Sequence, residues 1–72
     1  MFKVGQKVCL IRNMGLKCVI ERLYFVVNEQ WMVGGAASKK QFALVKVLEN
    51  SSNNKDVPPL FEISVTDLMI IY

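Results

Sequence analysis

The side chains that most often carry enzyme catalysis are scarce in this chain. It contains no histidine, so the commonest general acid–base group at neutral pH is missing. Its two thiols are Cys9 and Cys18, and a nucleophilic cysteine needs a nearby cation or a helix N-terminus to lower its pKa. Lys7, Lys17 or Arg22 could supply that cation, but the sequence offers no group to orient such a pair. The thiols therefore do not indicate nucleophilic catalysis.

Acidic residues and glycines form no catalytic or phosphate-binding pattern either. The acids are scattered along the chain as Glu21, Glu29, Glu49, Asp56, Glu62 and Asp67. Gly34-Gly35 is followed by Ala-Ala-Ser, whereas a phosphate-binding loop carries a lysine there. Two cysteines without histidine are too few for the usual zinc site. We therefore predict a protein that is not an enzyme and has no catalytic residues, cofactor or metal.

The two cysteines are too far apart for a CxxC motif, but a hairpin could bring them together. A turn centred on Asn13-Met14 would place Cys9 opposite Cys18. A three-residue turn with Gly15 in a left-handed bulge would shift the register by one and separate them. Both registers stay open, and two reduced, half-buried thiols are the simpler expectation in a reducing cytoplasm.

Apolar residues alternate as in strands through most of the chain. Such patterns cover residues 18–27, 41–48 and 61–65, a first strand precedes them, and an apolar segment ends the chain at residues 69–72. The expected breaks are a hairpin turn at Asn13-Met14-Gly15, a glycine-rich tip at residues 34–38, a polar loop at residues 49–56 and a helical turn at residues 64–68. Five strands with a short helical turn before the last one form the layout of an SH3-like barrel.

The fold prediction is therefore an all-β, SH3-like barrel of about five antiparallel strands, with a short 3-10 turn before the last strand and a single domain over residues 1–72. The predicted core comprises Val8, Leu10, Val19, Leu23, Phe42, Leu44, Phe61, Ile63 and Leu68. With 72 residues and 53% hydrophobic residues, the domain is too small to bury all its apolar side chains, so we expect exposed patches or self-association. No apolar run approaches the ~20 residues of a spanning helix, and no signal peptide is evident. We expect a cytoplasmic protein with no membrane partner.

The first third of the chain carries a family resemblance. Gly5 and Gly15 are flanked by Val8, Leu10, Val19 and Leu23. This spacing resembles the KOW motif of transcription elongation factors and ribosomal proteins, in which a turn glycine follows one strand and opens the next. The resemblance covers about residues 4–30, and the later strands resemble the wider Tudor-like layout. Lys17-Cys18 stand where the family often has a second glycine. The resemblance implies an RNA- or DNA-binding module.

Positive charge is concentrated near the N-terminus. The formal net charge is +3, and residues 1–22 hold Lys3, Lys7, Arg12, Lys17 and Arg22 against one acid, Glu21. Such a hairpin could neutralise phosphates while Tyr24 or Trp31 stacks on bases. The same lysines could instead protect an edge strand from aggregation.

Protein binding is the competing expectation, and the one that we favour. Trp31 lies near Tyr24 and Phe25 in the sequence and could line an aromatic groove or join the core. The high apolar fraction favours contact with another chain. We predict a small adaptor, of the kind that phage or mobile-element accessory proteins provide, that contacts a protein partner through a basic–aromatic surface. The alternative is a nucleic-acid partner. The candidate contact residues are the same for both: Lys7, Arg12, Lys17, Arg22, Tyr24 and Trp31.

Overall fold

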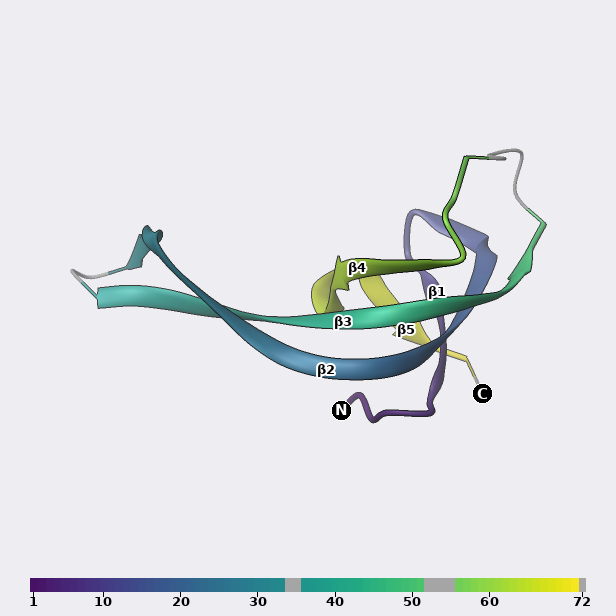
Figure 1. Cartoon of the computed structure of the whole chain (residues 1–72), viewed down its shortest axis with the longest axis horizontal. Coiled ribbons are helices and arrows are strands. Elements are labelled where there is room, and N and C mark those ends of the chain that lie inside the picture. Colours follow the sequence, from purple (N-terminus) through teal and green to yellow (C-terminus); the bar gives the residue numbers. More distant parts are fainter. Residues whose placement is uncertain (34–35, 52–55, 72) are drawn as a thin grey trace.

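Five antiparallel strands form one sheet, with a 3-10 turn before the last strand (Figure 1). The structure, a computed structural model, describes residues 1–33, 36–51 and 56–71, with side chains described outside residues 28–38. The elements are β1 (Lys7–Leu10), β2 (Asn13–Val33), β3 (Ala36–Asn50), β4 (Leu60–Ser64), η1 (Val65–Asp67) and β5 (Leu68–Ile70). The strand order is β4-β3-β2-β1-β5. The predicted all-β class, strand number and 3-10 turn are confirmed.

The first hairpin turns earlier than expected. Leu10 pairs with Asn13, so the turn is Ile11-Arg12, and residues 13–15 already belong to β2. β3 holds them in the sheet, because Leu16 pairs with Asn50 and the Ser51 amide donates to the Gly15 carbonyl at 3.0 Å. The expected turn at Asn13-Met14-Gly15 is therefore wrong.

The glycine that needs a left-handed backbone in the described chain is Gly5, with φ of +87°. It lies in the turn before β1, where its amide donates to the Ile20 carbonyl at 2.7 Å. Gly15 does not have the positive φ expected of a left-handed bulge. Positive φ is strained for a residue with a Cβ, so Gly5 fixes the entry into the sheet.

The two cysteines follow the register that separates them. Cys18 pairs with Val8, and Cys9 pairs with Lys17, with an irregularity between Cys9 and Leu10. Both thiols are free and buried. They are more deeply buried than the half-buried thiols expected from the sequence.

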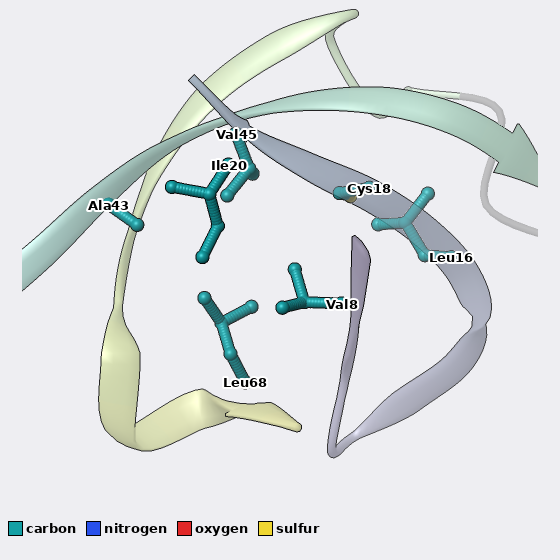
Figure 2. Close-up of a cluster of buried hydrophobic side chains, with 7 residues drawn as sticks. All are labelled: Val8, Leu16, Cys18, Ile20, Ala43, Val45 and Leu68. Atoms are coloured by element: carbon teal, nitrogen blue, oxygen red, sulfur yellow. The ribbon is translucent and has the colours of Figure 1, made fainter. Parts of the chain in front are cut away.

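The core lies inside the curl of the sheet (Figure 2). Its buried side chains are Val8, Leu16, Cys18, Ile20, Ala43, Val45 and Leu68. Val8 and Leu68 are buried as predicted, and the half-buried Leu10, Leu23, Phe61 and Ile63 pack against the cluster. The prediction is wrong for Val19, Phe42 and Leu44, which are half-buried but lie outside the cluster.

A bulge in β2 explains the error at Val19, whereas Phe42 and Leu44 simply lie on the opposite face of β3 from the buried Ala43 and Val45. Leu16, Cys18 and Ile20 point into the core, and then the register shifts between Ile20 and Arg22. Before this irregularity the even-numbered residues of β2 point inward, and after it the odd-numbered residues do. Leu23 therefore lies opposite the buried Ala43. One extra residue in a strand moves every later side chain to the other face. A single alternation from Val19 to Val27 therefore could not describe β2.

β2 and β3 extend together beyond the other strands. β4 pairs with β3 only over Phe42 to Lys46, and β1 pairs with β2 only as far as Val19, whereas the β2–β3 ladder continues to Val33 and Ala36. The two strands therefore leave the barrel as a two-stranded ribbon, and the molecule measures 43 × 23 × 17 Å (Figure 1). The ribbon replaces much of the expected tip at residues 34–38, of which Gly34-Gly35 lie outside the described residues. None of the helical structure described in the chain is long and apolar enough to cross a membrane.

Candidate functional site

Four of the predicted contact residues project from the outer face of the sheet. Val8 and Cys18 point into the core, so their strand neighbours Lys7 and Lys17 point outward. Beyond the irregularity in β2, Arg22 and Tyr24 flank the inward-facing Leu23 and therefore also lie on the outer face. We call the side chains of Lys7, Lys17, Arg22 and Tyr24 the outer patch. These side chains come from β1 and β2, the first two strands that the sequence predicted.

The other two predicted residues lie elsewhere. Arg12 is exposed in the two-residue turn at the end of the first hairpin, beyond the last cross-strand pair. Trp31 belongs to β2 in the ribbon, and its side chain lies outside the described residues. The structure therefore does not join Arg12 to the outer patch.

An acid accompanies the cations at one end of the outer patch. The Lys17 ammonium lies 3.3 Å from a Glu49 carboxylate oxygen, and both side chains are about half exposed. An exposed pair of this kind contributes at most about 1 kcal/mol to stability. Lys7, Lys17, Glu49 and Ile71 share the walls of a shallow hollow of about 310 Å³. Glu49 lowers the positive potential that a phosphate would meet here.

A second acid lies at the other end of the outer patch. The Tyr24 hydroxyl donates a hydrogen bond to the Glu62 carboxylate. This hydrogen bond raises the pKa of Tyr24, burial and the Glu62 charge add to the rise, and Arg22 opposes it. Arg22, Tyr24, Leu44 and Glu62 line one hollow of about 370 Å³. The outer patch is therefore a surface of mixed charge that can bind polar and ionic groups of either sign.

The sequence predicted exposed apolar patches but did not locate the one at the base of the ribbon. Leu23 is half-buried on the inner face of the sheet, and the next two inner-face side chains, Phe25 and Val27, are 59% and 62% exposed. They lie opposite Gln41 and Lys39, and the Lys39 ammonium lies 5.0 Å from the centroid of the Phe25 ring. We call Phe25, Val27 and Lys39 the ribbon face. The sequence did contain a signal for this surface. The alternating segments at residues 18–27 and 41–48 are similar in length, and the segment at residues 61–65 is too short to pair along all of either one.

A corner opens where β4 leaves the edge of β3. Residues 39–42 of β3 and residues 64–67 enclose a hollow of about 640 Å³. Ser64 ends β4, accepting a hydrogen bond from the Thr66 amide at 3.4 Å, and its hydroxyl lies 2.9 Å from the Thr66 hydroxyl. The Ile11 amide donates to the Asp67 carbonyl at 2.9 Å, which ties the end of η1 to the turn of the first hairpin. The hollow is therefore bounded by strand edge on one side and by a capped turn on the other.

The thiols are poorly placed for chemistry. Burial raises the pKa of the Cys18 thiol, and the neighbouring Cys9 raises it further. A raised pKa reduces the fraction of reactive thiolate at neutral pH. In the described part of the chain, no group of three histidine, cysteine, aspartate or glutamate side chains could hold a metal ion.

Comparisons with protein-family models, with curated proteins and with solved structures found no match to this chain.

Proposed function

We propose that the chain is a small, non-catalytic adaptor that binds a protein partner through the ribbon face, while the outer patch on the opposite face of the sheet offers a second, polar contact surface. The observation that carries the proposal is that the buried inner face of the sheet continues into the ribbon, where its side chains are exposed. Inside the barrel this face is the core, and along the ribbon it continues as Phe25 and Val27 with more than half of each side chain exposed. Aromatic and aliphatic anchors next to cations are typical of protein contact surfaces.

Lys39 fits this role. Its ammonium lies over the Phe25 ring, an arrangement that stabilises by about 0.5–1 kcal/mol at an exposed site. The contact keeps a positive charge beside an apolar anchor. The partner surface should therefore be apolar at its centre and acidic at its rim, because a cation steers the encounter while the apolar contact supplies the affinity.

Nucleic-acid binding is the second candidate. It is favoured by the cations that share the outer face, where Lys7 and Lys46 both lie beside Val19 in the register. It is disfavoured by Glu49 and Glu62, which lie within the same surface and would repel phosphates. The balance of charges on this face therefore supports the protein partner more than the nucleic acid.

Site-directed photocrosslinking tests the proposal. A photoreactive phenylalanine analogue replaces Val27 in one variant and Met69, an exposed residue of β5, in the matched control. After nuclease treatment of an extract from the natural host, we expect a discrete protein adduct from position 27 and none from position 69. The second substitution Phe25→Ser should remove that adduct. Adducts of equal yield at both positions, or loss of all adducts after nuclease treatment, would overturn the proposal.

A further inference from the structure

The edge of β3 is open for part of its length. β4 covers β3 from Lys46 to Phe42, where the last pair is Phe42 with Ser64. Beyond that pair the chain turns into η1, while β3 continues to Ala36, where β2 is its one partner strand among the residues that the structure describes (Figure 1). An uncovered strand edge offers backbone donors and acceptors to another extended chain.

The backbone groups at this edge can be assigned. The Val47 amide donates to the Pro59 carbonyl at 2.9 Å, so Val47 directs its backbone toward the β4 side. In an antiparallel ladder alternate residues point to the same neighbour, and the pairing of β3 with β4 has no irregularity. Gln41 and Lys39 therefore direct their N–H and C=O groups toward the β4 side; Gln41 lies next to the last β3–β4 pair, and Lys39 lies past the point where β4 ends.

The open edge also faces space. The hollow of about 640 Å³ at the end of β4 lies against residues 39–42, with residues 64–67 as its far wall. This volume lies within the range of small-molecule and peptide pockets, about 300–1,000 Å³. The first residues of an added strand would occupy the position that β4 vacates at Ser64.

The charge at the edge selects the occupant. Lys39 and Lys40 are exposed and adjacent on β3, so their side chains leave the two faces of the sheet on either side of the open edge. Asp67 lies on the far wall of the hollow. Acidic side chains on the face of an added strand that lies beside Lys39 would therefore meet a lysine at the end away from η1. A second copy of this chain is a poorer occupant, because its net charge is +3.

Resting on the proposed protein-binding function, we propose that the open edge of β3 at Lys39 and Gln41 binds an extended acidic segment of the partner by β-strand addition. Main-chain hydrogen bonds to Lys39 and Gln41 align the bound segment along the edge of β3. Lys39 selects glutamate or aspartate on its own face of the added strand, and apolar residues between the acids pack against the hollow.

The test uses a short synthetic peptide in which glutamate and valine alternate, titrated into the isotope-labelled full chain. We expect the largest amide shifts at Lys39 and Gln41, and none at Val45, whose edge β4 already covers. Two N-methylated peptides, methylated on alternate residues in opposite phase, separate strand addition from general charge attraction. One phase should abolish binding and the other retain it, since only one edge of an added strand faces β3. Equal binding of the two phases would overturn the proposal.

Two substitutions complete the test. Lys39→Glu should weaken peptide binding by about five- to tenfold, because it replaces an attraction between exposed charges by a repulsion. Lys46→Glu is the matched control, since Lys46 is an exposed lysine of the same strand whose edge pairs with Leu60. Equal losses in the two variants, or equally tight binding of a single-stranded oligonucleotide at Lys39 and Gln41, would refute strand addition. A photoadduct at position 27 without peptide binding would refute strand addition alone and leave the proposed function standing.

Discussion

Val45→Ala and Val19→Ala remove the same atoms from two strands that lie side by side, and they should differ widely in cost. Val45 is fully buried opposite Ile20, whereas Val19 lies on the outer face between Lys7 and Lys46 in the register. Deleting two buried methyl-sized groups costs about 1.6 kcal/mol in transfer free energy. A residual cavity of about 40 Å³ adds about 1 kcal/mol. The loss of strand propensity, up to about 1 kcal/mol, applies to both variants.

We therefore expect Val45→Ala to lower the free energy of unfolding by about 2–3 kcal/mol more than Val19→Ala does. A domain of this size should have a total stability of about 4–11 kcal/mol, so both variants should remain folded at room temperature. Urea unfolding followed by tryptophan fluorescence measures the difference. Thermal melts should separate the two variants by about 10 °C or more. Equal costs would contradict the difference in burial between the two valines, and a larger cost at Val19 would show that the inner and outer faces of β2 and β3 have been assigned the wrong way round.

Three further outcomes are expected. Gly5→Ala should cost about 1–2 kcal/mol in urea unfolding, because φ is +87° while nothing lies within 4 Å of the added Cβ; an unchanged midpoint would contradict this reading. Tyr24→Phe should flatten the fall in stability at high pH, because the raised pKa of Tyr24 gives a contribution that is complete below its unfolded value of about 10 and is lost as pH rises through the folded value. Urea unfolding of both proteins at about pH 8 and about pH 11 tests this, and parallel pH profiles would count against it. Iodoacetamide should label Cys9 and Cys18 only on unfolding, since both are buried and the pKa of Cys18 is raised; rapid native labelling in a mass spectrum would disprove the burial.

The fold class could be predicted from the sequence because it depends on features that local patterns record. Alternation, turn residues and the short Ser-Val-Thr-Asp segment at residues 64–67 together indicated five strands and a 3-10 turn. Val8 and Leu68 are buried as expected. These features depend on neighbours in the chain, and a single sequence contains that information.

The inner face of β2 could not be predicted because bulges are set by pairing between distant segments. Glu21 lies at an irregularity where Ile20 pairs with Val45 and Arg22 pairs with the adjacent Leu44. Nothing in the alternation of Val19, Leu23 and Val27 marks this shift. Both faces of the strand carry apolar residues, so hydrophobicity alone did not identify the inner one.

In the candidate site, too, some residues could be identified from the sequence, and others are brought in only by the fold. The sequence identified the cations and Tyr24 by type, and four of these side chains do share the outer face. Their acidic neighbours Glu49 and Glu62 lie on β3 and β4, far away in the chain, and only the register brings them to Lys17 and Tyr24. The ribbon face was missed for a related reason, because exposure depends on where β1 and β4 end.

The ribbon itself is the strongest physical argument for a partner. An isolated two-stranded ribbon is marginally stable in water, because each strand lacks a second neighbour and a covered face. Phe25 and Val27 lie just beyond the points where β1 and β4 end, so their burial contributes little to the stability of the folded monomer. A partner that covers this face and adds a strand at Lys39 and Gln41 would supply both missing contacts at once. The binding free energy and the rigidity of the ribbon should therefore be coupled, and hydrogen exchange at Gln41 should slow when the acidic peptide binds.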